Sequence, residues 1–364
     1  MKAQTFRMTL TAQGPVSIGS GEEISKKKYV LDPKNHQIVV MDMPKLYALA
    51  QKKNLGPSFE DFLCPPPEYR RNQDLWSWIR KNRISGKELQ RCVRYILPTG
   101  AIETSRKYNV WAFVKDPYGK PYVPGSSVKG MLRTILLAGC ITKDPERFAR
   151  EIAALQGARN DNDLKVVVQA LETKAFHTIG RPGTRWGDAV NDALSGLIVS
   201  DSEPLALGDL ILCQRLERKP DGKESTLPIL KESLRPGTPI RFSLTIDSSR
   251  CAVTKAALLE AVARFDKVYQ DCFLSVFSGM DRLTGSEVYL GGSAGFATKT
   301  VVYAALGRQA GVQKIQQILQ QSKAFRKHHH ERDQKRFGVS PRIVKCARYG
   351  GKLYEFGKCR LAVE

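Results

Sequence analysis

The sequence has no Cys-x-x-Cys pair, and its eight cysteines follow no regular spacing. A zinc ribbon requires closely paired cysteines, and a small secreted fold stapled by disulfides requires a regular cysteine framework. The cysteine pattern therefore disfavours both classes of protein. We expect these side chains to be reduced thiols, most of them buried in the folded chain.

Long apolar runs are also missing, because no stretch of about 18 apolar residues occurs that could span a membrane. The chain begins Met1-Lys2-Ala3 and passes directly into an alternating strand pattern, without the charged and then apolar segments of a secretory leader. We therefore expect an unprocessed, cytoplasmic chain that has no membrane partner.

Acidic residues are few relative to basic ones. Lys and Arg number 58 against 36 Asp and Glu, so the formal net charge is +22 and the sequence pI is about 9.7. This excess is typical of proteins that displace counterions from nucleic acid, although an anionic membrane or an acidic protein partner favours the same composition. Without a membrane-binding segment, we interpret the charge as a signal for nucleic acid.

Neither common nucleotide-binding signature is present, because no Walker A loop and no G-x-G-x-x-G between strand and helix occurs. We therefore expect no nucleotide cofactor. A different glycine-rich segment spans residues 290–300 and ends in Lys299 and Thr300. Its glycines allow backbone N–H groups to approach a ligand, and the lysine adds positive charge. The segment predicts a polyphosphate backbone as ligand, with a flexible hairpin turn as the alternative.

Strand and helix patterns alternate along the chain. Alternating apolar residues at 6–10 predict a strand, and residues 16–21 predict a turn-rich loop after it. Residues 29–41 predict a β-hairpin that leads into a helix capped by Asp42. Residues 54–108 contain a proline break and two helical stretches that carry Trp76 and Trp78. This segment predicts a helical insertion in which the tryptophans belong to the core.

From residue 238 onward the order is strand, helix, glycine-rich loop, helix and strand, which suits a ferredoxin-like unit. Residues 1–235 show the same alternation around the insertion. We predict an α+β fold of tandem ferredoxin-like/RRM-like domains. The first spans residues 1–235 and carries the insertion at about 54–108, and the second spans residues 236–364 and carries the glycine-rich loop.

Four segments occur in a characteristic order: Val16–Gly21, Pro121–Thr134, Val199–Ser202 and Gly291–Phe296. Together they resemble the RAMP superfamily of CRISPR-associated proteins, over most of the chain outside the insertion. The Pro-Gly-Ser-Ser-x-Lys-Gly-x-Leu-Arg element at 124–133 is the most specific part. Within the superfamily, the length, the paired modules and the closing Cys359-Arg360-Leu361 most resemble the fifth-subunit family of type III-A Csm effector complexes.

The resemblance implies a tandem RAMP fold and a function. Members of this family cap the complex at the 3′ end of the crRNA, and the resemblance implies a role in crRNA maturation and complex assembly during antiviral defence. It also implies contacts with the crRNA and, in the assembled complex, target RNA. Its implied protein partners are the backbone RAMP subunit, the small helical subunit and host nucleases. It implies no cofactor.

Lys129 and Arg133 lie one turn apart at a predicted helix start, where backbone N–H groups and the helix dipole favour anions. We expect both on an exposed first turn in contact with phosphates, although a solvated helix face is the alternative. The three lysines at 26–28 and two arginines carry weaker cases. The predicted RNA-binding residues are Gly19, Ser20, Gly21, Lys27, Ser126, Ser127, Lys129, Arg133, Arg181, Arg185, Gly291, Gly292, Ser293, Gly295 and Lys299.

The alternative function is a metal-independent endoribonuclease that processes CRISPR guide RNA, which needs a general base and a general acid. His177, beside the arginine-rich loop 176–188, is the one candidate that we consider, and no partner acid is evident. The run His328-His329-His330 lies among cations that oppose metal binding and predicts a solvated basic loop. We therefore predict a binding subunit with no catalytic residue and no metal site.

Overall fold

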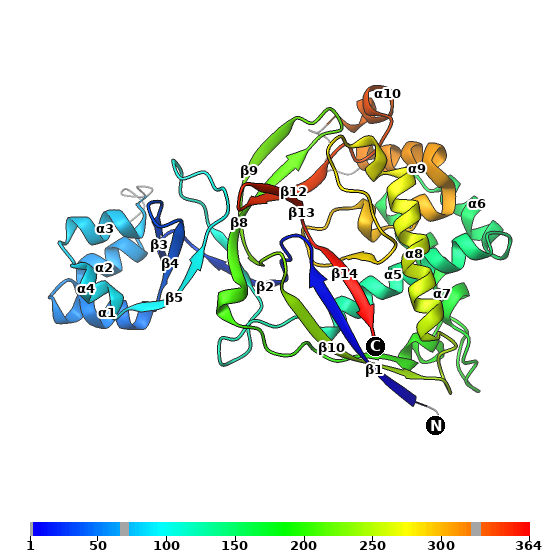
Figure 1. The fold of residues 1–364 in the computed structure, drawn as a ribbon, viewed down its shortest axis with the longest axis horizontal. Helices are drawn as coiled ribbons and strands as arrows, with labels where there is room; N and C mark the ends of the chain where they lie inside the picture. Colours follow the sequence, from blue (N-terminus) through cyan, green and yellow to red (C-terminus); the bar gives the residue numbers. More distant parts are fainter. Residues whose placement is uncertain (1–2, 66–72, 322–328) are drawn as a thin grey trace.

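The computed structural model describes residues 3–65, 73–321 and 329–364. Figure 1 shows a large body on the right and a smaller lobe that projects from it on the left. Two sheets lie in the body and a third lies in the lobe. Helices and sheets both contribute extensively, so the predicted α+β class is confirmed.

The first sheet has the strand order β11-β14-β1-β10-β7, and all its neighbouring strands are antiparallel. Its central strand forms as the alternation predicts, because Met8 and Leu10 are fully buried while Arg7 and Thr9 are less buried. The strands are β1 (Ala3–Ala12), β7 (Leu197–Val199), β10 (Pro239–Asp247), β11 (Glu287–Tyr289) and β14 (Lys358–Val363).

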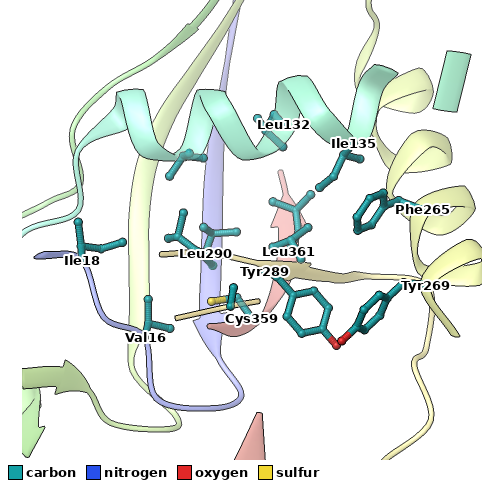
Figure 2. Packing of buried hydrophobic residues seen from close by; sticks show 14 of the residues in the cluster. Val16, Ile18, Leu132, Ile135, Phe265, Tyr269, Tyr289, Leu290, Cys359 and Leu361 are labelled. Atoms are coloured by element: carbon teal, nitrogen blue, oxygen red, sulfur yellow. The ribbon is translucent and has the colours of Figure 1, made fainter. Parts of the chain in front are cut away.

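Two helices complete this ferredoxin-like unit. Helix α5 (Gly125–Lys143) comes between β1 and β7, and α8 (Lys255–Cys272) comes between β10 and β14. The strand order β14-β1-β10-β7 with these two helices is that of a β-α-β-β-α-β fold. Figure 2 shows the core between them, where Leu132 of α5, Phe265 of α8 and Leu361 of β14 are buried together.

The sequence predicts two consecutive units that divide at residue 235. In the structure, β1 from the predicted first unit lies between β10 and β14 from the second. The division therefore does not separate two sheets. The physical reason is that the N-terminal strand finds its hydrogen-bonding partners in segments that are distant in the sequence.

The second sheet has the order β13-β12-β8-β9-β6-β2, in which β6 and β9 are parallel and the other pairs are antiparallel. One face joins the main core through residues such as Leu212 and Leu230. The opposite face carries a small apolar cluster that includes Cys213 and Phe356. The strands are β2 (Gly19–Ile24), β6 (Val110–Phe113), β8 (Leu210–Arg218), β9 (Glu224–Leu234), β12 (Val344–Tyr349) and β13 (Lys352–Glu355).

The lobe has a core of its own, in which Phe59 and Trp78 pack with ring centroids 4.8 Å apart. The predicted hairpin and the Asp42 cap are confirmed, since Asp42 Oδ1 accepts a hydrogen bond from the N–H of Lys45 at 3.2 Å. The elements of the lobe are β3 (Tyr29–Asp32), β4 (Gln37–Met41), α1 (Met43–Lys52), α2 (Gly56–Leu63), α3 (Leu75–Lys81), α4 (Gly86–Gln90) and β5 (Val93–Pro98).

The lobe therefore begins earlier in the chain than the predicted insertion at 54–108. The hairpin and α1 belong to it because Met41 and Leu46 pack in the same apolar cluster as the helices that follow. Trp78 is buried, as predicted, whereas Trp76 is 43% exposed. Part of the predicted proline break lies outside the described residues, because Pro66 and Pro67 fall in the undescribed gap.

The remaining helices lie on the body, and none in the described ranges is long and apolar enough to cross a membrane. They are α6 (Ala149–Gly157), α7 (Asp161–Phe176), α9 (Val302–Gln321), which is interrupted at Gly307, and α10 (Asp333–Phe337). Six of the eight cysteines are buried, as the sequence predicts for most of them. Burial raises the pKa of Cys359 to about 12, which keeps this thiol protonated near neutral pH.

Candidate nucleic-acid interface

The glycine-rich loop follows β11, and its first residues pack closely against the body. Gly291 has φ +90°, and a Cβ there would lie 2.3 Å from the carbonyl oxygen of Ser17. The loop therefore packs against the Val16–Gly21 segment, so two of the segments that carry the family resemblance meet. Ser293 is buried, whereas Gly292 and Lys299 are exposed. Within this loop, Gly292 and Lys299 can meet a ligand and Ser293 cannot.

The Val16–Gly21 segment differs from the turn-rich loop that the sequence predicts. Gly19 begins β2, an edge strand whose register against β6 is irregular between Gly19 and Glu23. Gly21 has φ +85°, a backbone conformation that favours glycine. Gly19, Ser20 and Gly21 are exposed on this edge. Their exposure keeps them as candidate contacts, although they belong to a strand.

The Pro-Gly-Ser-Ser element starts α5 with Pro124 at the N-cap position, where a proline side chain has no group that can bond to the helix N-terminus. Instead, the N–H of Gly125 donates to Oδ1 of Asp201 at 2.8 Å. A Cβ on Gly125 would lie 2.3 Å from the carbonyl oxygens of Val199 and Ser200. The helix start is thus packed against the Val199–Ser202 segment. Because a carboxylate already occupies this N-terminus, it is less available to a phosphate than the sequence predicts.

Arg133 is not on an exposed first turn, which corrects the prediction. Its Nη1 donates to Asp192 at 2.6 Å and its Nε donates to Glu172 at 2.8 Å, and its guanidinium lies over the ring of Phe176. Two carboxylates neutralise this arginine, so it holds α5 to the segments around it. Lys129 is half-buried and Ser127 is half-buried, whereas Ser126 is exposed.

The weaker cationic candidates divide into two kinds. Lys27 is engaged within the protein, because its Nζ donates to the carbonyl oxygen of Leu63 at 2.9 Å and lies over the ring of Phe62. Arg181 and Arg185 are exposed in the predicted long loop. Their backbone N–H and carbonyl groups form hydrogen bonds within the loop, whereas neither guanidinium bonds to any of the described residues. The two arginines therefore remain available to a ligand, and Lys27 does not.

The histidines have structural contacts in the described part of the chain. His177 caps the end of α7 and is buried, with Nδ1 at 3.0 Å from the carbonyl oxygen of Trp186. His330 is also buried, with Nδ1 at 2.7 Å from Oδ2 of Asp333, so it is not part of a solvated loop as predicted. His328 lies outside the described residues. No group of His, Cys, Asp or Glu suited to a metal occurs in the described ranges.

A further set of cations was missed by sequence reasoning. Arg215 of β8, Lys231 of β9 and Lys345 of β12 lie on the second sheet, and Lys299 approaches them from the glycine-rich loop. Burial, with the positive charges of Arg215 and Lys299 next in weight, lowers the pKa of Lys345 to about 8. Each of these three strands contributes one of the cations, so strand pairing brings together charged residues that are far apart in the sequence.

Comparison with known proteins decides the family. Residues 9–273 match the RAMP superfamily. The CRISPR system Cms protein Csm5 of Mycobacterium tuberculosis (strain CDC 1551 / Oshkosh) is 30% identical over 389 residues, which cover 98% of this chain and 97% of that protein. The chain belongs to the Csm5 family of the RAMP superfamily. The resemblance predicted from the sequence is confirmed.

Other relatives support the assignment of this chain to the Csm5 family. A Csm5 from Streptococcus thermophilus is 29% identical over 315 residues and covers 84% of this chain and 82% of that protein. A solved chain of a Csm-crRNA-target RNA ternary complex from a type III-A CRISPR-Cas system aligns with a TM-score of 0.67 at 19% identity. That alignment covers 98% of this chain and 100% of the other, and it shows that the two share the RAMP fold.

Proposed function

We propose that this protein is the Csm5 subunit of a type III-A CRISPR effector complex, where it binds RNA and caps the 3′ end of the crRNA. The observation that carries the proposal is the nearly full-length match to Csm5 proteins. The solved complex with crRNA and target RNA supports both RNAs as partners. The backbone RAMP subunit and the small helical subunit are the proposed protein partners.

The RNA-binding role is supported by charge and by exposed groups. The chain carries a net charge of +22, which attracts a phosphate backbone. Gly292, Lys299, Arg181 and Arg185 are exposed and offer backbone N–H groups or cations to it. We propose these residues, with Ser126 and the β2 edge, as RNA contacts.

We further propose that the protein binds RNA without cutting it. General acid–base cleavage needs a histidine or a comparable group that can reach the scissile phosphate. Buried His177 and buried His330 are engaged with a backbone carbonyl and a carboxylate, respectively. Their structural contacts support a binding role over the endoribonuclease alternative. crRNA maturation would then depend on host nucleases that act at the capped end in the cytoplasm.

Reconstitution of the complex with and without this subunit tests the proposal. We expect the complete complex to contain this chain and crRNAs of uniform 3′ ends, as read by sequencing the bound RNA. Without the subunit, the 3′ ends should become heterogeneous. A complex that forms with the same crRNA ends in the absence of the subunit would contradict the capping role.

The purified chain alone tests the enzymatic alternative. We expect no cleavage of repeat-containing RNA by the wild-type chain, and His177→Ala should not alter crRNA lengths in the reconstituted complex. Cleavage by the wild-type chain that His177→Ala abolishes, with RNA binding retained, would support the endoribonuclease instead.

A further inference from the structure

One face of the second sheet collects an exposed tryptophan and several cations. Lys231 of β9 is paired in register with Cys213 of β8 and with Trp111 of β6. Lys345 of β12 is paired with Glu217 of β8. Residues paired across neighbouring strands point to the same face of a sheet. The apolar cluster with Cys213 and Phe356 lies on this face, and the main core lies on the other.

The positive charge on this face exceeds the negative charge that it contains. Among the described residues, the amino groups of Lys231, Lys299 and Lys345 have no hydrogen bond or ion pair within the chain. Two carboxylates share the face. Glu217 forms an ion pair with Nη2 of Arg215, and Glu23 of β2 is paired in register with Trp111. Arg215 and the three lysines outnumber these two acids. The face is therefore complementary to an anion with several negative charges.

Arg215 provides a second observation in the same place. In the described part of the chain, its Nε is buried and has no hydrogen-bond acceptor. A buried donor without an acceptor costs folding free energy, and an oxygen of a bound anion would satisfy it. Arg215, with this unsatisfied Nε, lies on β8 between β9 and β12, the strands that carry Lys231 and Lys345.

Trp111 distinguishes among possible anions. Its side chain is 44% exposed although both neighbours in β6, Val110 and Ala112, are buried. Single-stranded nucleic acid offers unstacked bases to aromatic side chains and phosphates to cations, whereas a duplex hides its base faces. Trp111 and Lys345 are separated by three strand spacings of about 4.8 Å, so roughly 14 Å of sheet is available.

We propose that this face binds a short single-stranded segment of RNA, with one base stacked on Trp111 and the adjoining phosphates held by Arg215, Lys231, Lys299 and Lys345. We name it the β6-β12 face. The inference rests on the proposed function and assigns the RNA backbone to a surface that the glycine-rich loop borders. Because the contacts are to phosphates and to a base plane, binding is independent of sequence.

Titration of the purified full-length chain with a single-stranded RNA of about 15 nucleotides at several salt concentrations tests the proposal. One variant combines Lys231→Ala, Lys299→Ala and Lys345→Ala, and a second carries Trp111→Ala. The matched control removes an equally exposed tryptophan and three exposed lysines away from this face: Trp76→Ala, Lys34→Ala, Lys87→Ala and Lys165→Ala.

We expect the triple-lysine variant to lose affinity and to reduce the slope of log K against log salt by about 2, because three phosphate contacts are removed at about 0.7 each. Trp111→Ala should weaken binding by about 5-fold to 150-fold without changing the slope. The control should bind like the wild type, apart from a small loss shared by any reduction in net charge. A second set, with Lys→Gln and Trp111→Leu, guards against misfolding and should give the same results.

Three outcomes would overturn the proposal. In the first, the variants of this face bind RNA as the wild type does. In the second, the control loses as much affinity as they do, so total charge alone matters. In the third, the variants keep RNA affinity but no longer join the complex, which would make the face a protein contact. Failure of the wild-type chain to join the complex would contradict the proposed function, whereas RNA binding by this face is measured independently on the purified chain.

Discussion

Arg133 joins three parts of the body through two ion pairs and a contact with Phe176. Replacing it by Ala should therefore destabilise the protein by about 1–3 kcal/mol, since Glu172 and Asp192 would lose a partner in a partly buried position. Urea unfolding measures this loss. Lys129→Ala serves as the control and should be nearly neutral, because this lysine of the same helix forms no ion pair with any of the described residues.

The result at Arg133 separates a structural role from a role in RNA binding. An unchanged unfolding free energy together with weaker RNA binding would support the phosphate contact that the sequence predicts. Reduced stability with RNA affinity preserved is the outcome that the geometry predicts.

Asp266 lies buried on α8, where its Oδ2 accepts a hydrogen bond from the N–H of Glu287 at 2.7 Å. Burial, together with the nearby Glu287 carboxylate, raises the pKa of Asp266 to about 8. Between about pH 4 and pH 8 the folded protein keeps a proton that the unfolded chain releases, so this residue lowers stability as the pH rises. Above about pH 8 its cost becomes constant.

Asp266→Asn should remove that pH dependence because an amide does not ionise. The stability advantage of the variant over the wild type should grow by up to about 1.4 kcal/mol per pH unit between pH 5 and pH 8. Urea unfolding at pH 5, 7 and 9 checks this. Asp271→Asn on the same helix, where the carboxylate is exposed, should show no comparable trend. Parallel curves for Asp266→Asn and the wild type would contradict the assignment.

Helix α5 contains two glycines with opposite surroundings. A Cβ on Gly125 would collide with the backbone oxygens of Val199 and Ser200, whereas a Cβ on Gly130 would meet no atom of the described residues within 4 Å. Gly125→Ala should therefore cost about 1–3 kcal/mol, because backbone must move apart. Gly130→Ala should stabilise the helix by up to about 1 kcal/mol. Thermal unfolding of both variants tests whether close packing explains the glycine at position 125. Equal losses of stability in the two variants would contradict this explanation.

The same helix shows where element prediction from sequence succeeds. The amphipathic pattern at 128–137 predicts α5, and the alternating residues at 240–246 predict β10, because local periodicity reflects which side chains face a core. The pattern at 16–21 predicts a loop where an irregular edge strand forms. A strand rich in glycine and serine has little apolar alternation, so only its pairing with β6 reveals it.

The lobe is held to the body through Glu232, a fully buried carboxylate of β9 that accepts hydrogen bonds from Tyr95 of β5 at 2.6 Å and from the N–H of Phe113 at 2.8 Å. Its ends are close, since the N–H of Lys26 donates to Asn109 Oδ1 at 3.3 Å. The lobe also has its own apolar core. These features allow it to be removed as a unit.

Replacing residues 27–108 by a short Gly-Ser linker should leave β2 and β6 joined as a hairpin and the body folded, though less stable, because Tyr29 and Leu97 of the lobe also pack in the main core. We expect the shortened chain to drop out of the reconstituted complex or to admit extra backbone subunits, as measured by native mass spectrometry. Unchanged stoichiometry would contradict an assembly role. An unfolded product would show that the lobe chiefly completes the core.

The sequence by itself determined the family, the α+β class and the cationic character, because each depends on motifs, periodicity or composition that are local or additive. It also placed the Asp42 cap and the buried Trp78. The structure changes the interpretation of two candidate site residues. Arg133 and Lys27 looked like free cations, but their carboxylate, carbonyl and ring partners come from other segments of the chain.

Only the tertiary structure decided that β1 lies between β10 and β14, since strand pairing depends on long-range hydrogen bonds that local pattern does not encode. The same holds for the β6-β12 face. Trp111, Lys231 and Lys345 are single residues on separate strands, and nothing in their sequence neighbourhoods links them. They share a surface because the register of the second sheet turns all three to the side opposite the core, where burial and neighbouring cations lower the pKa of both lysines.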